Sequence, residues 1–229
     1  MRSFALSLAI IFGGTFPGRS MVISQSPDAH TRIKQWLDKA VVGFNLCPYA
    51  KDAVDSNTVR IAHCHSENPE EIIDALLNEA ALLLDGDAFA SPEESTPPAT
   101  TSIVVATQIP NTDEGLAVWL GIDEWFQNFL DEDEKEEDPE EQLFAGELSC
   151  AFFHPSWKFN DAAEEDPVNF ERRSPFPLVS LLKKSEIKTL VDEGLSRGVS
   201  ISEEIHIRNR NKLRSLGNEK LTEIYNNFR

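Results

Sequence analysis

The feature that most constrains the fold is the alternation of two hydrophobic periods along the chain. Segments 58–64, 102–109 and 146–154 are short and rich in β-branched or aromatic residues, which predicts strands. Around them, apolar residues recur three and four positions apart, which predicts amphipathic helices. Strands that alternate with helices are typical of α/β folds. The sequence therefore predicts a small, largely parallel sheet of three or four strands flanked by helices, with a helical C-terminus; an antiparallel edge strand stays open.

Two of the expected helices begin with recognisable signals. Asn68 precedes Pro69, and Ser174 precedes Pro175, so each pair places a capping side chain before a proline at the first helical position. The expected helices cover residues 31–46, 69–84, 113–130, 175–184, 186–195, 202–216 and 219–228. Ser185 is expected to cap the helix at 186–195, and Gly217 is expected to end the helix at 202–216.

Acidic residues dominate the charge of the chain, which has 229 residues and a net charge of −18. Residues 131–141 contribute −8 of this charge and residues 161–166 contribute −4. We interpret both runs as solvated acidic loops on a nearly neutral body, with a tether for a basic partner as the alternative. Clustered Lys and Arg are missing, which argues against nucleic acid as a partner because binding to phosphates needs cations.

The N-terminal twenty residues, MRSFALSLAIIFGGTFPGRS, resemble a targeting sequence. The apolar run from Phe4 to Phe12 is too short to span a bilayer core of about 30 Å, and small residues follow it. Residues 1–25 are thus predicted to be a targeting segment that is cleaved. It would direct the protein to the secretory route or to an organelle, and its resemblance to the import signals of complex plastids suggests a plastid. If Met21 is the start, the protein is cytoplasmic. Residues 26–229 are predicted to form one domain with flexible insertions at 85–101 and 131–142, and no membrane partner is expected for the mature form.

Three cysteines raise the question of thiol or metal chemistry. Cys47, Cys64 and Cys150 match neither a zinc-site spacing nor a CxxC pair, so no metal is predicted and the thiols are expected to be reduced. Cys64 and Cys150 lie within predicted strands and are expected in the core. Cys47 continues an apolar stripe at the end of its helix, where the helix dipole should raise the thiol pKa. Pro48 should end that helix within a residue or two of Asn45. A structural role is favoured for Cys47, and catalysis stays open.

Polar residues follow each predicted strand, where open parallel sheets gather ligands. These ends are residues 63–65, 107–108 and 154–155. His63 and His65 share a strand face and could chelate a metal, but no third ligand follows at a fixed spacing, so two rim histidines are the simpler interpretation. His154 is a candidate acid, base or ligand donor, or a histidine satisfied by the main chain.

Arg172 and Arg173 lie directly before the expected helix start at Pro175. A helix N-terminus beside an arginine fork can hold a phosphate or a carboxylate. The alternative is that both arginines pair with the acids at 161–166.

Three stretches, GFNLCPYA (43–50), FHPSWKF (153–159) and NFERRSPFP (169–177), are together similar to an uncharacterised bacterial-type family of single-domain proteins, a domain of unknown function. The resemblance covers about 31–217 without the two insertions and implies no established activity. The chain departs from the family pattern at Ser180, where a histidine is usual, and at 183–184, where a basic-acidic pair is usual; this argues against a metal site there. The matching positions are Asn45, Cys47, Pro48, His154, Pro155, Asn169, Arg173, Ser174, Pro175 and Pro177.

These observations lead to one leading hypothesis and two rivals. The leading hypothesis is a domain that binds a small anionic molecule, with enzymatic activity open, at a site formed by the Asn45–Cys47 corner, His154 and the Arg173–Ser174 helix start. Its candidate catalytic residues are Cys47 and His154, and its candidate ligand-binding residues are Asn45, His154, Asn169, Arg173 and Ser174. The rivals are an interaction or assembly protein that uses its acidic loops and C-terminal helices, and a redox protein that uses the Cys47 thiol. The sequence does not identify a cofactor or a reaction.

Overall fold

The computed structural model describes residues 27–85, 98–130, 144 and 146–228. The predicted targeting segment, most of the insertion at 85–101 and the insertion at 131–142 lie outside the described residues.

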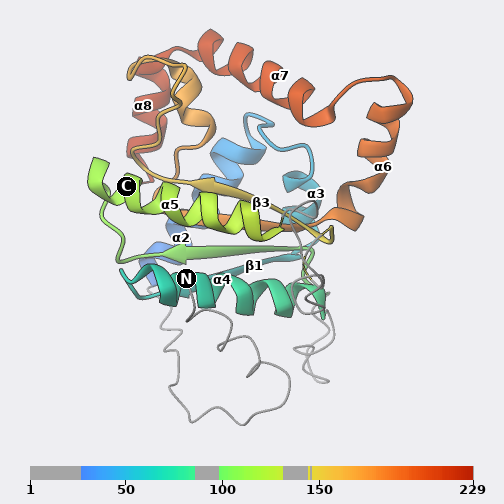
Figure 1. Ribbon diagram of the computed structural model, residues 1–229. Helices are drawn as coiled ribbons and strands as arrows, with labels where there is room; N and C mark the ends of the chain where they lie inside the picture. The colour runs from blue at the N-terminus through green and yellow to red at the C-terminus, as the bar shows by residue number, and fades with distance from the viewer. Residues whose placement is uncertain (1–26, 86–97, 131–143, 145, 229) are drawn as a thin grey trace.

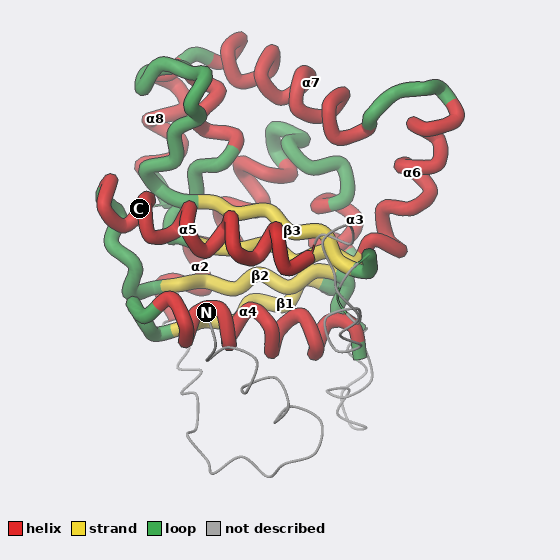
Figure 2. Tube along the Cα trace, viewed as in Figure 1, coloured by secondary structure: helices red, strands yellow, loops and turns green. Residues whose placement is uncertain are grey.

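Four strands form one mixed sheet in the order β1-β2-β4-β3 (Figure 2). The strands are β1 (Val59–Cys64), β2 (Thr101–Ala106), β3 (Leu148–Phe153) and β4 (Leu178–Lys183). β1 pairs with β2 in parallel, whereas β4 pairs antiparallel with both β2 and β3. The prediction of a small α/β sheet with flanking helices and a helical C-terminus is confirmed, but the prediction of a largely parallel sheet is wrong.

The error lies in residues 175–184, which form strand β4 instead of the expected helix. A proline disfavours helical geometry in the residue before it, so Pro175 and Pro177 both favour extended backbone. Pro177 immediately precedes the strand, a position where proline interrupts no ladder hydrogen bond. The Leu178–Lys183 segment then takes a central place in the sheet, and Leu181 is fully buried there.

β4 lies between β2 and β3, and the strand ends that were predicted to gather ligands still meet at one edge of the sheet. Since β4 is antiparallel to both neighbours, β3 runs in the same direction as β1 and β2. Leu178, at the start of β4, is in register with Val105 of β2 and Phe153 of β3. The carboxyl ends of β1, β2 and β3 therefore meet at one edge of the sheet, together with the residues that lead into β4.

Helices α4 (Pro69–Leu84) and α5 (Asp113–Leu130) cover one face of the sheet (Figure 1). α4 begins as expected, because the side-chain oxygen of Asn68 accepts a hydrogen bond of 3.0 Å from the Glu70 amide. Trp119 and Phe126 of α5 pack against Phe152 of β3 and are fully buried. This aromatic contact fixes the middle of α5 against the carboxyl-terminal part of β3.

The other face carries α2 (Pro27–Trp36), α7 (Ile201–Leu216) and α8 (Asn218–Asn226). α2 continues as a π-helix, η1 (Leu37–Val42), so helical structure ends about three residues before Asn45, earlier than expected. Asn45 adopts a left-handed conformation with φ 53°, which asparagine tolerates better than most residues, and the chain turns there. A short helix that the sequence did not predict, α3 (Ala50–Asp55), follows.

The remaining elements connect and flank these layers. A 3₁₀ turn, η3 (Pro167–Glu171), precedes β4, and α6 (Lys184–Ser196) follows it directly without a side-chain cap, so Ser185 is not the cap that was expected. α7 ends at Gly217 as predicted, where φ is 79°. Among the helices that the structure describes, none has the length and apolarity needed to cross a bilayer.

Candidate functional site

A cavity of about 320 Å³ lies beyond the carboxyl end of β3. Its walls come from the start of α5, the segment after His154, the 161–166 loop and the approach to β4. Two cationic and two anionic side chains share it with smaller groups. The lining residues are Asp113, Leu116, Pro155, Ser156, Lys158, Glu164 and Arg173.

His154 lies beneath this cavity and is fully buried. Its Nδ1 accepts a hydrogen bond of 3.1 Å from the Ser156 amide, so the ring proton is on Nε2, which donates to the Pro110 carbonyl at 3.1 Å. Burial lowers the pKa of His154, although the hydrogen bond to Pro110 opposes this shift. The neutral ring thus uses both nitrogens to hold the 154–156 segment against the loop that leads into α5. This geometry is that of a positioning residue.

Asn169 holds the opposite wall. Its side chain is fully buried, and its oxygen accepts a hydrogen bond of 3.0 Å from the Phe159 amide. Its amide nitrogen donates to the carbonyls of Ala163, at 2.8 Å, and Glu164, at 3.1 Å. Asn169 therefore closes the 159–164 loop into the shape that brings Glu164 to the cavity.

Arg173 lines the cavity directly. Its Nε donates to the Trp157 carbonyl at 3.2 Å, and one terminal nitrogen donates to the Glu164 carbonyl at 3.4 Å. Its guanidinium lies 4.6 Å from the centroid of the Phe170 ring, a cation–π contact. These contacts hold the guanidinium at the wall of the cavity, which Lys158 also lines.

Ser174 has a different role from the one expected. No helix begins at Pro175, and the Ser174 hydroxyl donates to the Phe176 carbonyl at 2.6 Å. The predicted anion site at a helix N-terminus after Ser174 is therefore wrong, because the chain enters a strand there.

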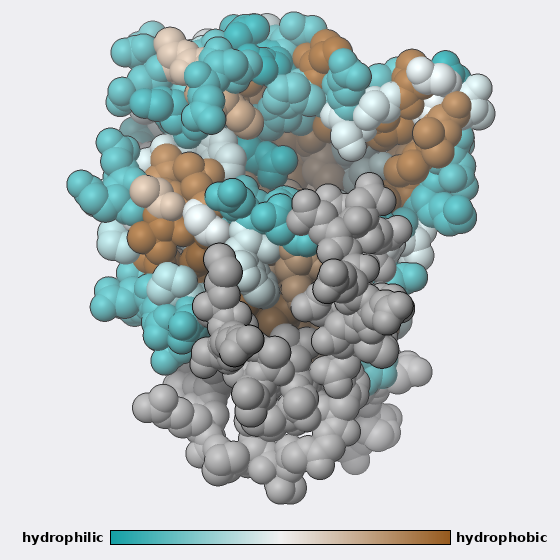
Figure 3. All heavy atoms as spheres, viewed as in Figure 1, coloured by the Kyte–Doolittle hydropathy of each residue, from teal (hydrophilic) through white to brown (hydrophobic). Residues whose placement is uncertain are grey.

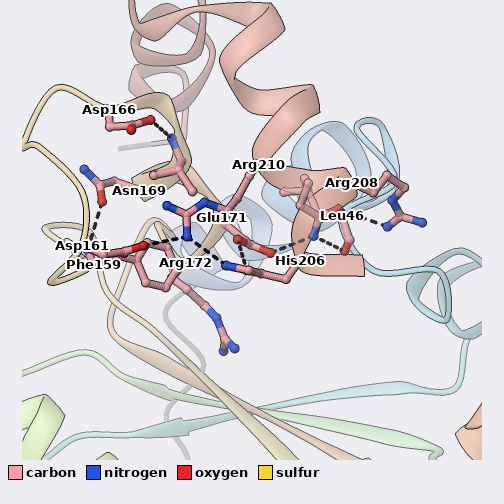
Figure 4. A network of polar contacts seen from close by, with 12 residues as sticks. Leu46, Phe159, Asp161, Asp166, Asn169, Glu171, Arg172, His206, Arg208 and Arg210 are labelled. Atoms are coloured by element: carbon pink, nitrogen blue, oxygen red, sulfur yellow. Dashed lines mark hydrogen bonds and ion pairs between the residues drawn. The ribbon is translucent and has the colours of Figure 1, made fainter. Parts of the chain in front are cut away.

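Asn45 and Cys47 contribute no lining to this cavity and lie against α7 instead. Arg208 donates to the Asn45 carbonyl at 2.6 Å. Asn209 donates at 2.8 Å to the carbonyl of Leu46, which is labelled in Figure 4. The Cys47 thiol packs at the edge of the core beneath α2 and α7. Burial raises the pKa of this thiol, against smaller opposing effects of the Tyr49 and Ala50 amides and of Arg208.

We expect the Cys47 thiol to be alkylated slowly. Because burial disfavours the thiolate, iodoacetamide should modify Cys47 more slowly at pH 7.5 than it modifies free cysteine, and the rate should keep rising above pH 9. Peptide mapping by mass spectrometry would separate Cys47 from Cys150, whose pKa burial raises to about 12. Rapid modification with a midpoint below pH 7 would instead support a nucleophilic or redox thiol.

A second polar cluster, which sequence reasoning missed, joins α7 to the 161–171 segment (Figure 4). Arg210 donates to Asp161 at 2.9 Å and to Nε2 of His206 at 3.2 Å, and Arg214 binds Asp166 with two hydrogen bonds of 2.8 and 3.3 Å. His206, Arg210 and Arg214 recur every four residues and so share one face of α7. That four-residue spacing was the sequence signal from which this cluster could have been predicted. Two of the acids at 161–166 are thus paired with α7.

Glu171 occupies the centre of this cluster, and its side chain is only 10% exposed. Asn209 donates to Oε1 of Glu171 at 2.9 Å. Nδ1 of His206 lies 3.0 Å from Oε2, close enough for electrostatic attraction but not aligned as a hydrogen bond. Asn209 is therefore the aligned donor for a buried carboxylate.

Comparison with known proteins identifies a family without a described activity. No curated protein and no solved structure matches the chain. A family described as a protein of unknown function, DUF1415, matches residues 28–223. Because that match covers most of the chain and both sets of polar residues described above, this protein belongs to the DUF1415 family.

Proposed function

We propose that this domain binds a small molecule through an anionic group, a phosphate or a carboxylate, in the cavity beside Arg173. The observation that carries the proposal is that Lys158 and Arg173 line the same cavity. A guanidinium held in place by an aromatic ring and by carbonyl groups suits bidentate recognition of a phosphate or a carboxylate.

The other lining residues narrow the kind of ligand. A volume of about 320 Å³ lies at the small end of ligand pockets, which suits a metabolite rather than a large cofactor. Asp113 and Glu164 would repel a purely anionic molecule, so the ligand should also present hydrogen-bond donors or a cation to them. Lys158 is exposed, so its attraction should weaken with salt.

Binding is better supported than catalysis at this cavity. Ser156 is the one lining hydroxyl, and its Oγ donates to the Asn111 carbonyl at 3.0 Å. The Nδ1 of His154 accepts a hydrogen bond from the Ser156 amide and not from the Ser156 hydroxyl, so the two residues do not form a nucleophile–base pair. Redox chemistry by Cys47 is also disfavoured by its raised pKa.

A thermal-shift experiment tests the proposal. Phosphate and a panel of small carboxylates should raise the Tm of the wild type at matched ionic strength, by about 5 °C or more once the ligand exceeds its Kd a hundredfold. Arg173→Gln should lose most of this shift, each variant being compared with its own ligand-free Tm.

Arg172→Gln is the matched control. Arg172 also contacts an aromatic ring, that of Phe153, but it does not line the cavity, so this variant should keep the shift. If Arg173→Gln folds poorly, Lys158→Gln serves in its place because Lys158 is exposed. Equal shifts in the wild type, Lys158→Gln and Arg173→Gln would reject the anion site.

A second candidate function is assembly through α6 and α7. Gly194 is the one buried residue of α6, whereas Leu195 is 68% exposed and Ile207 on α7 is 52% exposed. Figure 3 shows apolar side chains gathered over this part of the surface. Sedimentation velocity would test this candidate: self-association that Leu195→Asp with Ile207→Asp abolishes supports it, and a monomer at every concentration argues against self-assembly.

A further inference from the structure

Three of the five histidines in the chain gather where α2 crosses the end of β1. The ring centroids of His30, on α2, and His63, on β1, are 6.1 Å apart, and those of His63 and His65 are 6.3 Å apart. His63 is only 4% exposed. This histidine cluster, formed by His30, His63 and His65, belongs neither to the cavity nor to the α7 network.

The buried histidine has no hydrogen-bond partner. Both ring nitrogens of His63 and the Nδ1 of His30 are buried without one. Buried polar atoms are nearly always satisfied, so an unsatisfied imidazole in a folded protein needs an explanation. A neutral ring leaves one donor and one acceptor unmet, and a protonated ring would leave two donors and a charge.

The groups that face His63 offer no compensation for a positive charge. They are His30, with Lys34 also on α2, and His65, which directly follows β1 and whose Nδ1 lies 2.9 Å from the Thr107 hydroxyl. Neither His30 nor His63 is paired with a carboxylate. No three metal-ligand side chains of the described residues are placed to share an ion. The ligand that we consider for this cluster is the proton, which a single imidazole can bind.

We propose that the histidine cluster is an acid-sensitive latch between α2 and β1. At neutral pH the His30 and His63 rings are uncharged, and α2 packs on the sheet through the core that Ile33 and Trp36 share with Ile103 and Val105. Protonation places charge on a buried ring between two other imidazoles. β1 pairs with β2 on one side only, so α2 can move away from this edge and let water reach His63 without breaking the sheet.

The pH window follows from the sign of the shifts. Burial lowers the pKa of both His63 and His30, and the neighbouring imidazoles lower that of His63 further. The unfolded chain, with histidine near its ordinary pKa of 6.5, therefore binds protons more readily than the folded chain. Stability from this cluster is present above pH 6.5 and is lost as the pH falls below it.

The test compares unfolding by urea at pH 7.5 and pH 5.0 in the wild type and in His63→Leu. The leucine has no group to protonate, so the equilibrium constant for unfolding should rise by a smaller factor with acidification in His63→Leu than in the wild type, and one histidine with an unfolded pKa of 6.5 can account for at most about a thirtyfold difference. His154→Gln is the control for acid sensitivity elsewhere, because burial also lowers the pKa of His154.

Hydrogen exchange locates the effect. After correction for intrinsic rates, amides of α2 in the wild type and in His154→Gln should lose protection at pH 5.0 before those of α5, and in His63→Leu they should not. If His63→Leu does not fold, His30→Leu replaces it. Equal pH dependence in the wild type and the leucine variant, or loss of protection that begins outside α2, would overturn the latch.

Discussion

Asn169→Ala is expected to lower the free energy of unfolding by about 3 kcal/mol, or the Tm by about 6–12 °C. The change removes three hydrogen bonds within a fully buried site. It also leaves the Phe159 amide without its acceptor, whereas the Ala163 carbonyl keeps the Asp166 amide and the Glu164 carbonyl keeps Arg173 as a donor. Urea or thermal unfolding would measure the loss.

The matched control is Asn160→Ala in the same loop. Asn160 is exposed, so its removal should change stability by no more than about 0.5 kcal/mol. Asn169→Ala should also weaken any anion-induced shift, because the loop positions Glu164 and receives a bond from Arg173. A stable Asn169→Ala protein with an unchanged ligand response would show that the loop holds its shape without this side chain.

The elements with long, regular patterns were predictable from the sequence. α4, α5 and α7 follow clear helical periods, and the caps at Asn68 and Gly217 work as local chemistry requires. β4 was not predicted, because a serine before a proline and leucines near helical spacing also fit a helix. Only the repeated Xaa-Pro pattern distinguishes the two, and the pairing with β2 and β3 decides between them.

The candidate site was only partly accessible from sequence for a similar reason. The motif that follows β3 and the motif that precedes β4 meet at one cavity because their strands are neighbours. The GFNLCPYA segment, by contrast, packs against α7. Local patterns show which residues are unusual, but the partner of Asn45 lies 163 positions away. Such long-range contacts are set by packing, which no local signal encodes.

Asn209→Ala is the second large effect that we expect, at about 3 kcal/mol. Asn209 is buried on α7, and its amide nitrogen donates both to the Leu46 carbonyl and to Glu171. A hydrogen bond to a charged group contributes about 1.5–3 kcal/mol, and a buried carboxylate that loses its donor keeps its desolvation cost. Helix propensity offsets this loss by about 0.6 kcal/mol, because alanine is the better helix former.

Asn211→Ala measures that offset alone, because Asn211 is exposed on the same helix. Its free energy of unfolding should rise by about 0.6 kcal/mol. Arg214→Ala provides a second comparison. In its bidentate pair with Asp166 the Arg214 side chain is 50% exposed and the Asp166 side chain 19%, so water screens the pair and its loss should cost about 1 kcal/mol. In urea unfolding, Asn209→Ala should therefore have a much lower free energy of unfolding than Asn211→Ala and Arg214→Ala. If Asn209→Ala and Arg214→Ala cost the same, the exposed ion pairs rather than the buried Asn209–Glu171 contact attach α7 to the domain.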